Sequence, residues 1–445
     1  MPEDRTKADG RTIVLHFVRV PPQHRGSATP IVWFAGGPGE SVISDFSDGG
    51  IQGYPLSSAL RETHEILFLD QRGTGLSNQL QCSMYPHVSN VFAEIFPLDS
   101  VRRCRALLAK TSDLSAFGTD AAADDLDAVR RHLGYRKVIA IGGSYGTTAA
   151  LVYMRRYPNA VESALLIGVA PTFFKIPLPQ LQAGQRALSD LERSCTHDSI
   201  CHRYFPNFPA EFRRVLAQSS TGIPVNYRDT HTGEHVHAAL TRPVFADTVR
   251  LLMYAPQSAV QIPLLVHEAV RGNTTPLAKA IAAYAQAVFG GTASEQAMGD
   301  NFGVNCQEGV AFITPAEAAR ESANSFMAGS ILDARQASCA IWNVRPADLS
   351  FIEPVRSSVP VLMISGADDP ATDPRYATRQ LAYLSHGRQI IVPNGGHIND
   401  DRCLEQLEVR FVQASSTAGL DAACVKRFSR PPFVTSLSAI PKWLR

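Results

Sequence analysis

A serine stands between two glycines in the stretch GGSYG at residues 142–146, directly after a short apolar run. A serine hydroxyl becomes a nucleophile when a histidine takes its proton and a carboxylate orients that histidine. On a tight turn between a strand and a helix, small residues two positions before and after the serine let the two elements pass closely. By chance the pattern G-x-S-x-G arises in roughly one chain of this length in seven. Ser144 is therefore a candidate nucleophile whose partners must be found elsewhere in the sequence.

A histidine follows the last strand-like run of the chain. Residues 388–392 (RQIIV) are typical of a buried strand, and two glycines at 395–396 precede His397. Loops at the carboxyl ends of parallel strands collect the reactive groups of such sheets. We therefore predict that His397 swings toward Ser144 and acts as its general base. The alternative is a solvated loop histidine.

Three aspartates lie in the loop that follows the strand-like run at residues 359–365. They come after Ser144 and before His397, which is the chain order serine, acid, histidine that accompanies a serine on this kind of turn. Asp369 stands three residues after Gly366, and this spacing favours it as the carboxylate that orients His397. Asp368 and Asp373 lie in the same loop, and the sequence leaves both as alternatives.

Backbone amides are needed to hold the negative charge that develops on a substrate carbonyl oxygen. One should be the amide of Tyr145, directly after the nucleophile. The other should come from the glycine-rich stretch GGPG at residues 36–39, because glycines let the backbone approach a substrate closely. Within it we favour the amide of Gly37, since Pro38 has none to donate.

Strand-like and helix-like segments alternate around these residues. The strand-like runs occupy residues 12–20, 30–35, 65–69, 137–141, 164–169, 359–365 and 388–392, the first of them alternating like an antiparallel edge strand. This order predicts a mostly parallel sheet with helices on both faces. Between the fifth and sixth runs the pattern becomes rich in helices. We therefore predict an α/β core made of residues 1–170 and 351–445, with an inserted helical cap at 171–350.

The bulk composition excludes several classes of partner. The chain has 445 residues, a formal net charge of +1 and 45% hydrophobic residues. The balanced charge gives no reason to expect nucleic acid or an anionic membrane surface as a partner, and no apolar run reaches membrane-spanning length. The first ten residues are polar and mixed in charge, unlike a secretory signal.

Eight cysteines lie in close sequential pairs along the chain. They are Cys82, Cys104, Cys195, Cys201, Cys306, Cys339, Cys403 and Cys424. This spacing predicts four local disulfides in an oxidising compartment, whereas the absence of any C-x-x-C pair argues against a zinc site. We expect a secreted or periplasmic protein whose signal has been removed. The alternative is a cytoplasmic enzyme with eight reduced thiols.

Taken together, five motifs resemble those of the proline iminopeptidase group of α/β-hydrolases, and most closely its secreted tripeptidyl aminopeptidase-like branch. They are GGPG at 36–39, DQRGTGLS at 70–77, GGSYGT at 142–147, GADDP at 366–370 and GGH at 395–397, with VNCQEG and SCAIW as further similar segments. The resemblance implies an α/β-hydrolase fold with a helical cap, and Ser144, Asp369 and His397 as nucleophile, acid and base. It also implies cleavage of residues or short peptides from a free N-terminus.

Members of this group hold the ammonium of the substrate with acids of the cap. Glu308, close to Cys306, is our candidate for that role. The alternative is that Glu308 is a surface glutamate.

The usual histidine before the GGPG stretch is Ala35 here. A peptide or small-molecule substrate is expected, without a metal or organic cofactor. A carboxylesterase on the same scaffold is the alternative function, because the fold does not fix the substrate.

Overall fold

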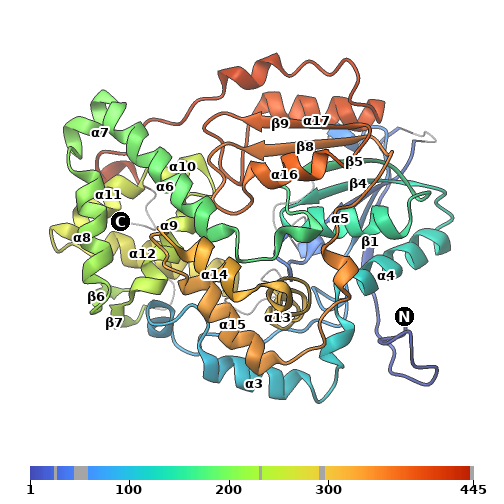
Figure 1. Ribbon diagram of the computed structural model, residues 1–445, viewed down its shortest axis with the longest axis horizontal. Coiled ribbons are helices and arrows are strands. Elements are labelled where there is room, and N and C mark those ends of the chain that lie inside the picture. The colour runs from blue at the N-terminus through green and yellow to red at the C-terminus, as the bar shows by residue number, and fades with distance from the viewer. Residues whose placement is uncertain (25–27, 45–58, 230–232, 290–295, 441–445) are drawn as a thin grey trace.

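The protein contains a seven-stranded sheet and is described here by a computed structural model covering residues 1–24, 28–44, 59–229, 233–289 and 296–440 (Figure 1). In spatial order the strands are β1 (Phe17–Val20), β3 (Ile66–Leu69), β2 (Ile31–Phe34), β4 (Val138–Gly143), β5 (Val161–Ile167), β8 (Val361–Gly366) and β9 (Gly387–Val392). β1 pairs antiparallel with β3 at one edge, and the other strands pair in parallel. The predicted mostly parallel sheet is confirmed.

Helices cover both faces of this sheet, so its central strands are buried on both sides and read as continuous apolar runs. Four of these helices are α4 (Thr119–His132), α5 (Tyr145–Arg156), α16 (Pro374–Leu381) and α17 (Arg402–Ala414). Residues of α4, α5 and α16 pack on one face with Val32 and Val138, and residues of α17 pack on the other with Ile31 and Ile139. Both hydrophobic cores therefore fix the strand ends from which the predicted site residues project.

The chain between β5 and β8 forms a group of helices that lies to the left of and below the sheet in Figure 1. These helices are α6 (Gln180–His197), α7 (Ser199–Tyr204), α8 (Phe208–Gln218), α9 (Arg242–Leu252), α10 (Pro256–Ala259), α11 (Ile262–Val270), α12 (Thr275–Phe289), α13 (Met298–Val304), α14 (Pro315–Ser322) and α15 (Ser330–Trp342). A hairpin of β6 (Ile223–Arg228) and β7 (His235–Leu240) lies among them. The sequence had indicated a helix-rich segment there and did not predict this hairpin, although buried and exposed residues alternate along β6.

The helices and hairpin between β5 and β8 are called the cap below. Two segments from outside residues 171–350 pack with them. Helix α3 (Leu98–Leu108) contacts α15, and the C-terminal segment returns to the cap, where Val434 donates its amide to Val260 at 3.2 Å. Phe433 and Ile440 are buried in the same hydrophobic cluster as the cap helices. The cap core therefore draws side chains from both flanks of the insertion.

Four disulfides join cysteines that are consecutive in the sequence. The pairs are Cys82–Cys104, Cys195–Cys201, Cys306–Cys339 and Cys403–Cys424. They separate their partners by 22, 6, 33 and 21 residues, so all four are local, as predicted.

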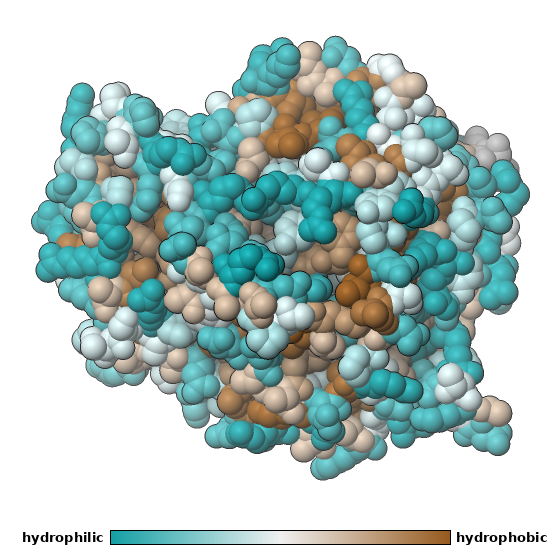
Figure 2. Space-filling model, in the orientation of Figure 1, coloured by the Kyte–Doolittle hydropathy of each residue, from teal (hydrophilic) through white to brown (hydrophobic). Residues whose placement is uncertain are grey.

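The face drawn in Figure 2 is mainly hydrophilic, with hydrophobic side chains gathered in small separate groups. Within the part of the chain that the structure describes, no helix is both long and apolar enough to cross a membrane.

Candidate active site

Ser144 occupies the sharp turn between β4 and α5 and has a backbone φ of 53° and ψ of −125°. A positive φ is uncommon for a residue with a side chain and persists only where the surrounding structure enforces it. Here Ser144 accepts a hydrogen bond on its carbonyl from the Thr147 hydroxyl at 2.6 Å and donates its amide to Ile167 at 2.9 Å. Both neighbouring elements therefore hold the strained turn.

The two glycines of the pattern are needed for close packing. A Cβ at Gly142 would lie 2.5 Å from the carbonyl oxygen of Gly146, and one at Gly146 would lie 2.2 Å from that of Phe34. Such contacts are shorter than any real side chain tolerates. Glycine is therefore needed on both sides of Ser144, because α5 passes close to β4 and β2.

His397 and Asp369 are brought together from the loops after β9 and β8. His397 Nδ1 donates to Asp369 Oδ2 at 2.8 Å, and the carboxylate is fully buried. Asp369 Oδ1 also accepts the amides of Ala371 and Thr372 at 2.7 and 2.8 Å, and Thr372 Oγ1 donates to Oδ2 at 2.7 Å. These donors fix the carboxylate. Because Nδ1 of His397 bonds Asp369, Nε2 is the ring nitrogen that can interact with a different partner.

The other two aspartates of the loop face away from His397. Asp368 Oδ2 accepts a hydrogen bond from Arg430 at 2.5 Å. Asp373 pairs with Arg186 and with Arg375, the latter at 2.6 Å. Of the three candidate acids, Asp369 is the one that contacts the histidine.

A segment of the cap after α9 holds His397 in place. The ring of Tyr254 meets the imidazole edge to face, with 4.9 Å between the ring centres. The amide of Ile398 donates to the Tyr254 carbonyl at 2.8 Å. Gly168 also adjoins the imidazole, because a Cβ at this residue, which has a φ of +61°, would lie 2.8 Å from His397 Cε1. The imidazole is therefore enclosed by one cap residue and one sheet-edge glycine.

The glycine-rich loop after β2 lies beside the nucleophile. Gly37 has a φ of 100°, and a Cβ there would lie 2.9 Å from the amide of Gly39. Helix α13 fastens the loop, because Asn301 Nδ2 donates to the carbonyl of Pro38 at 2.9 Å. Tyr145 begins α5, so its amide lies at the positive end of the helix dipole. The predicted oxyanion donors thus sit on two well-supported segments.

Glu308 lies behind Tyr145 and not in the cavity. Its two carboxyl oxygens are each 2.6 Å from Thr119, one from the amide and one from the hydroxyl. The same hydroxyl is 2.7 Å from the Tyr145 phenol oxygen. Burial raises the pKa of Glu308 to about 8, although the hydrogen bonds from Thr119 act in the other direction. The structure therefore does not bring Glu308 together with Ser144 and His397.

A cavity of about 1110 Å³ opens over the sheet edge and is lined by Ser144, His397 and Gly37 together with cap residues. Its lining also includes carboxylic side chains that sequence reasoning missed. They are Glu40, Asp247, Asp400, Asp401, Glu405 and Glu408. Two arginines, Arg250 and Arg335, line it as well. The acidic residues of the lining outnumber the arginines.

Glu40 is the acid next to the nucleophile. A Cβ at Gly36 would lie 2.6 Å from Glu40 Oε2 and 3.5 Å from the Ser144 Cβ, so the three residues adjoin. Burial raises the pKa of the Glu40 carboxyl, against the opposing effect of nearby His397. The signal for it in the sequence was its place directly after the GGPG stretch. Burial and the charge of Glu405 raise the pKa of Glu408, another residue of the cavity lining, to about 8.

Among the described residues, no group of three or more His, Cys, Asp or Glu side chains is arranged to hold a metal ion.

Two family models match parts of the chain. The first, described as alpha/beta hydrolase fold, matches residues 29–193. The second, described as TAP-like protein, matches residues 315–424.

Three known proteins illustrate what the chain is similar to. The putative hydrolase YuaR of Escherichia coli is 27% identical over 160 residues, which span 35% of this chain and 30% of that protein. The serine protease Hip1 of Mycobacterium tuberculosis is 24% identical over 465 residues, spanning 95% of this chain and 86% of the relative. A crystal structure of a mutant of the meta-cleavage product hydrolase CumD covers 90% of this chain and 95% of its own, with 13% identity and a TM-score of 0.41. The sequence matches support a serine hydrolase of the TAP-like branch.

Proposed function

Because this chain has the α/β-hydrolase fold, a TAP-like C-terminal part and similarity to a serine protease, we propose that it is a serine aminopeptidase of the proline iminopeptidase and tripeptidyl aminopeptidase kind. It releases residues or short peptides from the free N-terminus of a peptide. The observation that carries the proposal is the hydrogen bond from His397 to Asp369 at the wall of the cavity that Ser144 also lines.

The reaction proceeds through an acyl-enzyme. His397 takes the proton of Ser144 as the hydroxyl oxygen attacks the carbonyl carbon of the substrate. The amides of Gly37 and Tyr145 hold the oxyanion that forms. His397 then gives the proton to the leaving amine, and a water molecule activated by the same imidazole hydrolyses the ester to Ser144. Asp369 keeps the imidazole oriented throughout.

Recognition of a free N-terminus rests on the acidic lining of the cavity. Arg250 is already neutralised by Asp247 at 2.8 Å. Asp400, Asp401 and Glu405 remain as acidic residues of the lining, against the single charge of Arg335. A substrate ammonium would form charge-assisted hydrogen bonds with them. Glu40, which adjoins Ser144, would hold an ammonium one residue away from the bond that is cut.

Matched substrates test this proposal. Unblocked prolyl, alanyl and tripeptidyl anilides are compared with their N-acetylated forms and with a short-chain nitrophenyl ester. The aminopeptidase is supported when acetylation removes most of kcat/KM. Turnover of the ester without cleavage of any anilide would instead identify the carboxylesterase alternative.

Glu40→Gln separates removal of a single residue from removal of a longer unit. If Glu40 holds the ammonium, the variant should raise KM for single-residue anilides by about tenfold or more. Glu62→Gln, at an exposed glutamate that does not line the cavity, serves as the matched control. A longer unit is released if tripeptidyl anilides are preferred and Glu40→Gln leaves their KM unchanged.

The four disulfides support residence in an oxidising compartment, either outside the cell or in a periplasm. Peptide mapping of the protein from its native source without reductant tests this part of the proposal. Eight free thiols would contradict it and favour the cytoplasmic alternative.

A further inference from the structure

A buried guanidinium in the candidate catalytic cavity has no acidic partner among the described residues. Arg335 on α15 lines the cavity and is 7% exposed, yet no described carboxylate lies within ion-pair distance of it. Arg250, in the same cavity, is paired with Asp247. Burying a cation without an anion is costly, so the position calls for a negative group from another source.

Most of the hydrogen-bonding capacity of Arg335 is unused. Its Nη1 donates to Asn301 Oδ1 at 2.7 Å, and this is the hydrogen bond that the described residues supply to the guanidinium. Its Nε is buried without a partner. The planar group lies over the ring of Phe96, 4.3 Å from the ring centre, and near that of Phe302 at 5.3 Å. These rings orient the cation without neutralising its charge.

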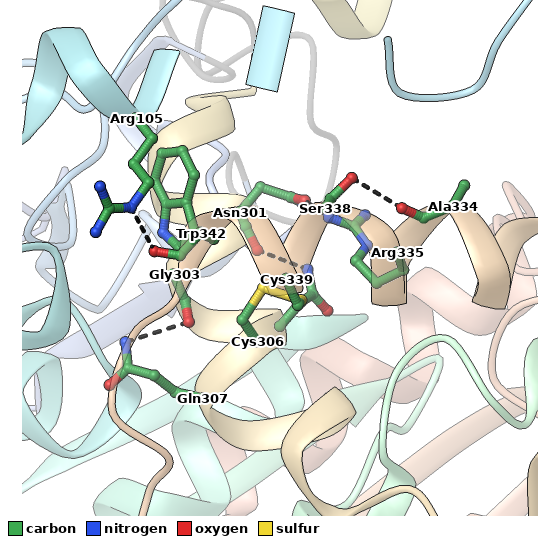
Figure 3. The surroundings of a disulfide bond; sticks show 11 residues. Arg105, Asn301, Gly303, Cys306, Gln307, Ala334, Arg335, Ser338, Cys339 and Trp342 are labelled. Carbon is green, nitrogen blue, oxygen red and sulfur yellow. Dashed lines mark hydrogen bonds between the residues drawn. A yellow bond between two sulfur atoms is a disulfide. The ribbon is translucent and has the colours of Figure 1, made fainter. Parts of the chain in front are cut away.

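The position of Arg335 is fixed from both ends (Figure 3). Cys339, one turn further along α15, forms a disulfide with Cys306 in the π-helical turn η5 (Asn305–Gly309) that follows α13. Asn301 of α13, which accepts from Arg335, also donates to the carbonyl of Pro38. Two consecutive hydrogen bonds therefore connect the guanidinium to the loop that carries the predicted oxyanion donor.

Burial lowers the pKa of Arg335 to about 9, although the charge of Asp247 acts in the opposite direction. The group still carries its proton at neutral pH. An anion bound against it would offset the cost of burial.

We propose that Arg335 binds a carboxylate of the substrate, within one or two residues of the bond that Ser144 attacks. This inference rests on the proposed function, because it takes the substrate to be a peptide. The rigid fork of a guanidinium matches the two oxygens of a carboxylate. That carboxylate belongs either to an acidic side chain on the residue whose carbonyl is attacked or to the free C-terminus of a short peptide.

Two matched pairs of substrates distinguish these sources. The first pair is Ala-Ala-Glu anilide and Ala-Ala-Gln anilide, and the second is tetra-alanine with a free or an amidated C-terminus. The measured quantity is the ratio of kcat/KM for the charged member to that for the neutral member. In at least one of the two pairs the wild-type ratio should be about ten or more, and Arg335→Met should reduce that ratio to about one. Arg335→Lys should give an intermediate ratio, since it keeps the charge without the fork.

Arg105→Met is the matched control, because Arg105 contacts the end of α15 through the Trp342 carbonyl at 2.8 Å but does not line the cavity. It should retain the wild-type ratio. Thermal unfolding of each variant shows whether a change in kcat/KM reflects misfolding. If Arg335→Met is misfolded, Arg335→Lys is used in its place.

Binding is measured separately, by calorimetric titration of the same pairs into Ser144→Ala and into Ser144→Ala with Arg335→Met. Tighter binding of the charged member that disappears with Arg335→Met supports the proposal even if no peptide is cleaved, in which case the proposed function alone fails. Ratios near one in both pairs, or ratios that survive Arg335→Met, would overturn it.

Discussion

Asp369 Oδ2 accepts the Nδ1 proton of His397 at 2.8 Å, while Asp368, the preceding residue, bonds Arg430 on the C-terminal segment. Adjacent carboxylates in one loop thus have different partners, one bonding His397 at the cavity wall and one bonding Arg430.

This division predicts unequal effects of two conservative substitutions. Asp369→Asn should lower kcat by about 10⁴-fold, because an amide stabilises the wrong tautomer of the imidazole. Asp368→Asn should change kcat by less than about tenfold, since Asp368 bonds Arg430 and does not contact His397. Both are measured on the best anilide substrate, with thermal unfolding as the check on folding. Similar losses in the two variants would show that the loop as a whole, and not Asp369, supports the reaction.

A second prediction concerns the nucleophile. Ser144→Ala should reduce kcat by about 10⁶-fold, and a fluorophosphonate should label the wild-type protein on the peptide that contains Ser144. Ser258 provides the control, because it lines the same cavity but its hydroxyl donates to the Ala255 carbonyl at 3.0 Å. Ser258→Ala should keep both activity and labelling. Labelling that persists in Ser144→Ala would exclude the assigned nucleophile.

A third prediction is a pH-dependent stability difference at Glu308. Its pKa is about 8 in the folded protein against an ordinary value of 4.5, so folding favours the protonated form. The stability that this contributes is present below pH 4.5 and is lost as the pH rises toward 8. Glu308→Gln mimics the protonated acid and should lose less stability over this range. The melting temperature of the variant should therefore rise relative to wild type by several degrees between pH 5 and pH 9.

Glu317→Gln is the control for this comparison. Hydrogen bonds from Lys175 and Thr314 outweigh partial burial and hold the pKa of Glu317 below its usual value. Its contribution to stability therefore changes only at pH values below 4.5, and the difference between this variant and wild type should stay constant from pH 5 to pH 9. A constant difference for Glu308→Gln as well would refute the buried-acid interpretation.

A fourth prediction compares two disulfides of the cap. Loop-closure entropy gives about 4 kcal/mol for the 33-residue separation of Cys306–Cys339 and about 2 kcal/mol for the 6-residue separation of Cys195–Cys201. Replacing the first pair with alanines should therefore lower the melting temperature more than replacing the second. An equal or opposite order would show that local packing outweighs chain entropy at these sites.

The sheet and the order of the reactive loops could be predicted because their signals are local. The apolar runs of the central strands are continuous. The GGSYG stretch begins at the end of β4, and the GGH stretch lies shortly after β9. The hairpin β6–β7 was missed because its short alternating segments lie among strong helical patterns.

The cap side of the site could not be read from the sequence, since it depends on contacts between distant residues. Glu308 stands behind Tyr145 because Thr119, 189 positions earlier, bonds both of its carboxyl oxygens. Likewise Glu40 and Arg335 are isolated charges in the sequence, and only the fold brings them to one cavity.

The pairing of consecutive cysteines has a consequence for how the chain matures. Eight cysteines allow 105 different sets of four disulfides. In this protein the first cysteine joins the second, the third joins the fourth, and so on along the chain. An oxidant that links thiols in the order in which they appear along the growing chain would produce this set directly. The chain could then acquire all of its native cross-links without a disulfide isomerase.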